Sequence, residues 1–444
     1  SRNRSAGRAW RGKGLHPRAE PGGGMNATLS TLPCGVRLFA DPDPTARTAA
    51  VGVWLRTGAR WETPGQNGIA HFLEHLVFKG AGGRTARALA EAAEDRGVIL
   101  NAHTGHERTA YHARCLGEDA LFALDLIADM LLAPHLDPAD IAVERGVVLQ
   151  EIAEAEDDAE DKAHVLHQGA VFARQPLGRP ILGAARNIER FGPEDARGFL
   201  SAALATGRVV VAAAGAVDPE AVAHWVETRF AGFIGPATGA PAPAVAHGGA
   251  ARRIRAGEQT HLVMSLPAPA AGDPDGVAAR LGAEILGGGA ASRLFQDLRE
   301  TRGLAYGVEA WCDAYEDAGR LCVGTACAPK DAADVAKRIA AHVADMAQAG
   351  PTPQEVARAR RVALAGVAMG RESWMGRCEA GAHHAFLFDR PIGIAELEAR
   401  INEVDAGAIQ RLFAAAAGSG LAAASAVGPR NGVVAADAFV DAWS

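Results

Sequence analysis

Two histidines and a glutamate in the first quarter of the chain have the spacing of a metal-binding catalytic helix. The run His71-Phe72-Leu73-Glu74-His75 separates its two histidines by four positions. On a helix, the two imidazoles lie one turn apart on one face and can share a cation, with Glu74 beside them. This order is that of the HxxEH zinc motif. The alternative, a surface helix with two unrelated histidines, is disfavoured by the specificity of the motif.

A hydrolytic zinc site needs a third protein ligand and an open position for water. Acidic side chains that qualify are concentrated further along the chain: Glu144, Glu151, Glu154, Glu156, Asp157 and Asp158. Glu144 and Glu151 lie two helical turns apart and share a face with Val148. Spacing alone does not choose between these two, and most of the acidic residues fit a solvated helix face equally well.

The zinc motif and three further stretches together resemble the pitrilysin/insulinase family of zinc peptidases. The further stretches are Asn101-Ala102-His103-Thr104, the run Glu144 to Glu151, and the run Leu286 to Tyr306. The similarity spans roughly residues 28–430. It is greatest to single-length bacterial members that are similar to mitochondrial processing peptidase.

The resemblance implies a role for each matching residue. His71, His75 and Glu151 would bind one Zn²⁺ per chain. Zinc would acidify a water and polarise the scissile carbonyl, while Glu74 would act as general base and pass the proton to the leaving amine. Glu144 would be a second carboxylate that orients a ligand histidine.

The resemblance also implies residues that bind substrate. Arg299 and Tyr306 match a pair with which the C-terminal domain of the family reaches substrate carbonyls. Without the resemblance they would be interpreted as a surface arginine and a core tyrosine. Asn101 and Ala102 fall on a strand that is an exposed edge in the family, where a peptide adds as a further strand through main-chain hydrogen bonds.

Other residue groups in the sequence favour structural roles. His103, His106 and His112 could form a second metal site, but strand alternation separates the first two and the third lies on the returning strand. Surface or strand-packing roles are therefore favoured for them. The run Gly287–Gly289 lacks the Lys-Ser/Thr of a phosphate loop and indicates a turn.

The elements that would position these residues alternate between strands and helices. Hydrophobic periodicity and turn residues in the first half predict strands at 36–40, 49–55, 98–104, 109–116 and 209–214, and helices at 68–79, 86–96, 118–132, 138–156, 158–173 and 219–230. In the second half they predict strands at 262–266, 304–313 and 320–327, and helices from 274, at 330–349 and at 353–373. This mixture predicts an α+β fold rather than a doubly wound sheet.

A Gly-, Pro- and Ala-rich segment at 232–250 has the composition of a linker. It predicts an N-terminal zinc-binding peptidase domain at 25–231 and a related C-terminal domain without a metal site at 251–444. From the resemblance, each domain would be a mostly antiparallel sheet packed with helices, and the two together would form half of a clam-like chamber.

The second half has the features of a diverged copy of the first. Aligning Asn67–Ala70 with Asp275–Ala278 places Ala279, Gly282 and Ala283 where the first half has its two histidines and glutamate. The alternative is that glycine-led helix starts are simply common.

Composition limits the classes of function. The 48% hydrophobic and 22% charged residues of this 444-residue chain are typical of globular proteins. A net charge of −7 and 5% aromatic residues give no support to nucleic-acid binding. Six scattered cysteines without a CxxC pair predict reduced thiols and a cytoplasmic location. The apolar run Leu412–Val427 is interrupted and too short to cross a membrane.

The first 24 residues are basic and precede the expected fold. They contain six of the 45 basic residues and one of the 52 acidic ones, so the remaining chain has a net charge of −12. We expect a non-core lead, which is either an artefact of the start site or a functional arm such as a targeting peptide.

Two functions remain open from the sequence. The first is a zinc endopeptidase that hydrolyses unfolded peptides or presequence-like segments inside a chamber. Family members of twice this length enclose peptide between two halves, so this chain would act as a homodimer or with a hetero-partner. The second is a non-catalytic or partner-dependent subunit of a processing-peptidase-like heterodimer, as arises when zinc residues are lost. The complete motif favours catalysis.

Overall fold

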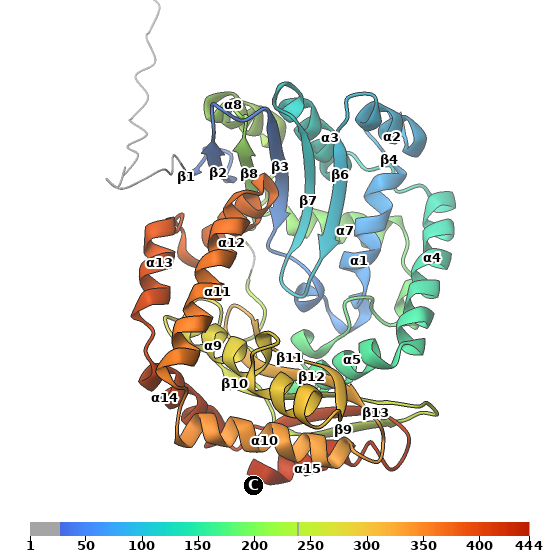
Figure 1. Ribbon diagram of the computed structural model, residues 1–444. Coiled ribbons are helices and arrows are strands. Elements are labelled where there is room, and N and C mark those ends of the chain that lie inside the picture. Colours follow the sequence, from blue (N-terminus) through green and yellow to red (C-terminus); the bar gives the residue numbers. More distant parts are fainter. Residues whose placement is uncertain (1–26, 238, 444) are drawn as a thin grey trace, which may run out of the picture.

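The computed structural model describes residues 27–237 and 239–443, and the basic lead at 1–24 lies outside them (Figure 1). Six strands form the first sheet, in the spatial order β1-β2-β8-β3-β7-β6. Their bounds are β1 Thr28–Thr31, β2 Arg37–Pro42, β3 Thr48–Leu55, β6 Ile99–Thr104, β7 Thr109–Leu116 and β8 Val209–Gly215. Strands β3 and β8 are apolar along their length because both faces of the sheet are covered.

Helices of the first half build an apolar core on one face of this sheet. The main ones are α1 Ile69–Leu76, α2 Ala86–Glu94, α3 Ala120–Leu132, α4 Pro138–Asp157, α7 Pro193–Ala203 and α8 Pro219–Phe230. Each contributes buried residues to one cluster with the sheet. The short helix α6 Ala185–Ile188 and the two-residue strands β4 Gly80–Ala81 and β5 Arg84–Thr85 complete this half.

Five strands form the second sheet, in the order β11-β12-β10-β13-β9. Their bounds are β9 Gly249–Ile254, β10 Thr260–Ala268, β11 Ala305–Ala314, β12 Gly319–Cys327 and β13 Ala423–Gly428. The helices that pack within this half include α9 Gly276–Ala283, α10 Ala332–Gln348, α11 Pro353–Arg371, α13 Ile394–Glu403, α14 Ala406–Ala417 and α15 Ala435–Val440. The chain is thus an α+β protein of two domains, as predicted.

The two sheets repeat one connectivity. Strands β9-β13-β10-β12-β11 have the same order and the same pairing directions as β2-β8-β3-β7-β6, including a single parallel pair in each. Helix α9 follows β10 as α1 follows β3. The repeat supports the inferred duplication, and α9 carries Ala279, Gly282 and Ala283, none of which has a side chain that binds metal.

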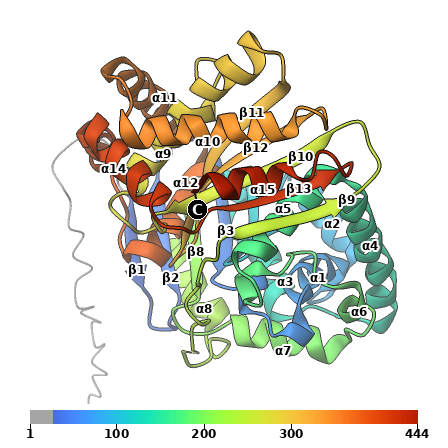
Figure 2. The ribbon, with the colours of Figure 1, turned by 90° about the horizontal axis from the view of Figure 1, so that it is seen from below.

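One helix from each half packs against the sheet of the other half. The sequence patterns did not indicate this exchange. Helix α5 Ala159–Val171 contacts β10 and β13 of the second sheet, whereas α12 Trp374–Phe388 contacts β2, β3 and β8 of the first. Figure 1 shows α12 rising beside β8, and Figure 2 shows α5 beside β9 and β13. The two domains are therefore interlocked through these helices.

Within the described residues, no helix combines the length and apolar character needed to cross a bilayer. All six cysteines are free thiols.

Candidate metal centre

Helix α1 is fixed at its N-terminus by a buried carboxylate. Glu62 Oε2 accepts hydrogen bonds from the Gly68 backbone N–H at 2.9 Å and from Asn67 Nδ2 at 3.0 Å, and Oε1 accepts from the Ala70 N–H at 2.9 Å. Burial raises the pKa of Glu62 to about 7, although these donors oppose the change. Gly68 has φ 103°, a conformation in which other residues are strained. These contacts set the position and direction of the helix.

The two histidines of α1 lie on its open arc, because Phe72 and Leu76 are buried on the other side. The rings of His71 and His75 have centroids 4.8 Å apart. Burial, together with the neighbouring His75, lowers the pKa of His71 to about 4. Its imidazole is therefore neutral at pH 7, which is the form that ligates metals.

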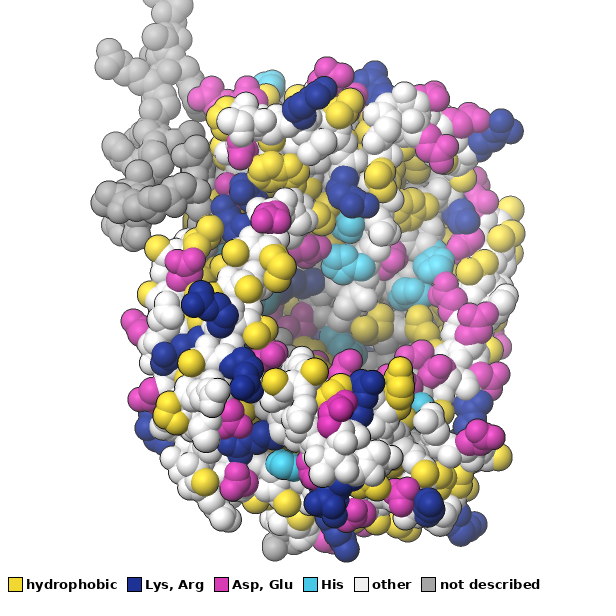
Figure 3. Space-filling view, in the orientation of Figure 1, with side chains coloured by type: hydrophobic (Ala, Val, Ile, Leu, Met, Phe, Trp, Pro, Cys, Tyr) yellow, Lys and Arg dark blue, Asp and Glu magenta, His cyan; other side chains and the backbone are white. Residues whose placement is uncertain are grey.

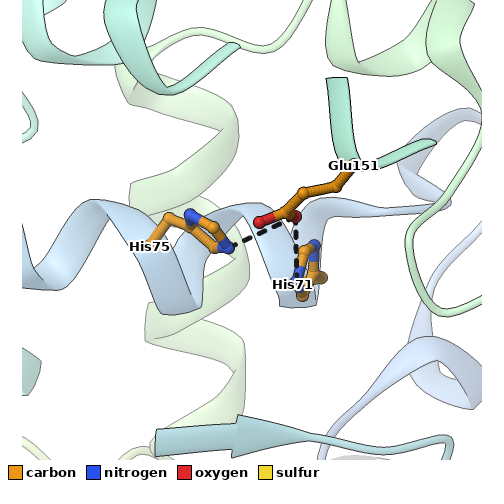
Figure 4. A group of neighbouring side chains, drawn as sticks. All are labelled: His71, His75 and Glu151. Atoms are coloured by element: carbon orange, nitrogen blue, oxygen red, sulfur yellow. Dashed lines mark ion pairs between the residues drawn. The ribbon is translucent and has the colours of Figure 1, made fainter. Parts of the chain in front are cut away.

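Helix α4 brings a carboxylate to these histidines. Glu151 Oε2 lies 3.7 Å from His71 Nε2 and 3.6 Å from His75 Nε2 (Figure 4). One ligand atom from each of the three residues lies within 4.8 Å of the others. The structure therefore separates the two candidates that spacing left equal, because Glu151 faces both histidines.

Glu144 lies two turns earlier on α4 and contacts only one histidine. Its Oε2 is 3.1 Å from His75 Nδ1, and its Oε1 is 2.6 Å from Lys79 Nζ. The Glu144 side chain is only 4% exposed. A carboxylate only accepts hydrogen bonds, so this geometry assigns the proton of His75 to Nδ1. Nε2 is then unprotonated and has a lone pair that can bind a metal ion. Glu144 thus has the geometry of an orienting carboxylate.

The three residues fit a zinc ion. Ligand atoms at about 2.0–2.2 Å from a tetrahedral zinc lie about 3.3–3.6 Å from one another, close to the separations of 3.6 and 3.7 Å observed here. In addition, Glu151 Oε2 is buried and makes no hydrogen bond within the described part of the chain. Two imidazoles and a carboxylate also form a common donor set of catalytic zinc, with a fourth position open.

Glu74 is held beside this group by the edge strand of the first sheet. The Thr104 hydroxyl of β6 donates a hydrogen bond to Glu74 Oε2. Among the described strands, β6 pairs only with β7, so its other edge is unpaired. Asn101 and Ala102 lie on this strand, the first exposed and the second half-buried.

A cavity of about 640 Å³ opens at His71 and Glu74. Ala102 and Thr104 line it from the first half, and Val263, Asp313 and Tyr315 line it from the second. Figure 3 shows histidine side chains gathered around a hollow between the two halves. Sequence reasoning missed Asp313 and Tyr315, because no local pattern indicates that the far end of β11 reaches the metal-binding half.

Arg299 and Tyr306 lie together, but not in this cavity. The Arg299 guanidinium is 4.9 Å from the centre of the Tyr306 ring, and Tyr306 is 83% exposed. Neither residue lines the cavity that contains His71 and Glu74. Tyr306 precedes Asp313 by seven residues of strand, which is about 23 Å.

Comparison with known proteins places this chain in a family. The family described as insulinase (peptidase family M16) matches residues 37–185, and the peptidase M16 inactive domain matches residues 190–362. The chain belongs to the insulinase family of M16 peptidases. The family assignment agrees with the predicted resemblance.

Several relatives share most of their length with this chain. An uncharacterized zinc protease of Mycobacterium tuberculosis is 36% identical over 365 residues, which are 81% of this chain and 83% of the relative. An uncharacterized zinc protease of Rickettsia bellii is 32% identical over 411 residues, covering 91% and 98% of the two chains. A solved protease structure from Helicobacter pylori has a TM-score of 0.84 at 19% identity, covering 91% of this chain and all of the other, and so shares the fold.

Proposed function

We propose that this protein is a zinc endopeptidase that binds one Zn²⁺ per chain through His71, His75 and Glu151. The observation that carries the proposal is the approach of Glu151 to both histidines across two helices, at 3.6 and 3.7 Å. The intact donor set favours a catalytic chain over a non-catalytic or partner-dependent subunit. Membership in a peptidase family also supports a catalytic role.

When bound, zinc would act as a Lewis acid that lowers the pKa of water and polarises a carbonyl. Glu74 accepts the proton of the attacking water and transfers it to the leaving amine. Thr104 holds the Glu74 carboxylate through its hydroxyl hydrogen bond. Glu144 orients the His75 ring through Nδ1.

The substrate is an unfolded peptide or presequence-like segment that adds to the free edge of β6. Asn101 and Ala102 offer main-chain groups there, and Ala102 lines the cavity next to Glu74. Pairing through the main chain accepts many sequences because it does not depend on side chains. Arg299 and Tyr306, in the second half, also bind substrate. Because they lie outside the cavity, either the second half must move or the peptide must extend along β11 from the cavity to Tyr306.

A second copy of the chain completes the chamber, and a related chain is the other possible partner. This proposal follows the family resemblance, in which two halves enclose the peptide. The six free thiols support a reducing compartment, the cytoplasm.

The decisive test is Glu74→Gln in the full chain. The variant should retain one zinc, because all three ligands remain, and should hydrolyse a peptide library at least about 100-fold more slowly because the general base is missing. Zinc content and mass-spectrometric digestion, each with and without chelator, measure both effects. Glu94→Gln, at an exposed position on α2, is the matched control. Equal turnover by metal-loaded Glu74→Gln protein would exclude the proposed mechanism.

A further inference from the structure

A second group of metal-ligating side chains lies on the other face of β6 and β7. Successive strand residues point to opposite faces, so His103 faces away from Thr104 and α1. His103 pairs with Ala110 and His112 pairs with Asn101, which makes the two histidines diagonal neighbours. Their ring centroids are 5.7 Å apart. The sequence analysis favoured surface or strand-packing roles for these histidines, because it did not consider the register that makes His103 and His112 neighbours across the two strands.

Helix α12 of the second half adds a carboxylate to this pair. Glu379 Oε1 lies 3.7 Å from His103 Nε2. One ligand atom from each of His103, His112 and Glu379 lies within 4.8 Å of the others. The group therefore has the same donor types as the first centre, assembled from three elements instead of two.

Two contacts distinguish this group from a solvated cluster. Glu379 Oε2 accepts a hydrogen bond at 3.0 Å from Nε1 of Trp54, a fully buried side chain, which fixes the carboxylate as outer hydrogen bonds fix metal ligands. His112 stacks on Trp54 with ring centroids 6.4 Å apart. Its Nδ1 is buried and has no hydrogen-bond partner among the described residues. A buried imidazole nitrogen without a hydrogen-bond partner costs free energy.

We propose that His103, His112 and Glu379 form a second divalent-cation site for zinc or another transition ion that accepts imidazole and carboxylate ligands. The His103 side chain is 52% exposed, so its ring can rotate to bring its ligand atom closer to the Glu379 carboxylate. The same exposure makes the site weaker than the first one. A bound ion would link the first sheet to α12, and hence one half to the other.

The test uses the full chain with the first centre removed. His71→Ala/His75→Ala protein is titrated with Co²⁺, whose visible absorption reports imidazole and carboxylate ligation. We expect about one equivalent to bind and to raise the melting temperature, because the ion binds only the folded chain. Adding His103→Ala or Glu379→Gln should weaken binding by at least about 10-fold. Adding His224→Ala, at an exposed histidine of α8, should not.

Two results would overturn the proposal. One is the absence of Co²⁺ binding by the His71→Ala/His75→Ala protein. The other is unchanged binding in both the His103→Ala and the Glu379→Gln backgrounds. Glu379→Gln keeps an oxygen for Trp54 Nε1, and the melting temperature of the metal-free variant shows whether it is folded. No substrate is present in the titration, so an inactive wild-type chain would refute the proposed function and leave this inference standing.

Discussion

Two carboxylates on one helix have different relations to the same pair of histidines. Glu151 faces Nε2 of both His71 and His75, whereas Glu144 contacts only Nδ1 of His75 and is paired with Lys79 on its other oxygen. A direct ligand contributes its own bond to the metal, while an outer carboxylate acts by holding a ligand in one tautomer and orientation.

This difference predicts an order of zinc affinities. Glu144→Ala should weaken zinc binding by about 10–100-fold, which is typical of an outer partner. Glu151→Ala should weaken it more, because the site loses one of its three protein ligands. Competition with a chelating dye measures both affinities. Glu154→Ala, an exposed carboxylate on the same helix, is the control, and a larger loss in Glu144→Ala than in Glu151→Ala would reassign the third ligand.

At the scale of elements, the exchange of α5 and α12 binds the two halves. Helix α12 buries Cys378, Ala382 and Ala385 against the face of the first sheet that its own helices leave open. At Gly381 a Cβ atom would lie 2.3 Å from the Phe39 ring. Two carbon atoms that are not bonded to each other cannot approach so closely, so the helix and sheet would have to move apart.

Gly381→Ala should therefore lower the free energy of unfolding by about 1–3 kcal/mol. Gly366 of α11 is the matched control, because a Cβ there meets nothing within 4 Å. Gly366→Ala should be neutral or stabilise by up to about 1 kcal/mol through helix propensity. Urea unfolding of both variants measures the contrast. A Gly381→Ala protein as stable as Gly366→Ala would show that α12 is not docked as described.

At the scale of the whole molecule, a buried arginine ties the two sheets together. Arg60 donates to Glu107 in the β6–β7 turn and to Asp317 in the β11–β12 turn, each at 2.6 Å. Its side chain is only 6% exposed. Arg56 and Glu316 form a second pair between the same two halves. Residues of both turns, His106 and Tyr315, line the cavity, so the ion pairs join two turns at its wall.

Arg60→Ala should destabilise the protein by about 3 kcal/mol, because it leaves the buried Glu107 carboxylate without its ion-pair partner. Arg87→Ala removes the exposed Arg87–Glu91 pair on α2 and should change stability by less than about 0.5 kcal/mol. Urea unfolding of the two variants gives the comparison. A similar decrease in the free energy of unfolding of both variants would mean that Arg60 does not form these ion pairs in solution.

Much of the fold follows from local sequence patterns. The predicted strands at 49–55, 109–116 and 320–327 agree with β3, β7 and β12 within a residue or two, because apolar runs between turns are strong local signals. The weak strand β9 was not predicted. The last three residues of β9 are exposed, and the strand forms by pairing with β13, which lies far along the chain.

The relation between His71, Glu74 and His75 is set by helix geometry alone, because 3.6 residues per turn place them on one arc wherever the helix lies. Helix geometry could not choose between Glu144 and Glu151, which share a face of α4. That choice depends on the angle at which α4 crosses α1, and packing sets this angle. The approach of Glu379 to His103 depends on α12 crossing to the other sheet. Tertiary contacts determine such crossings because the apolar surface that drives them comes from both halves of the chain.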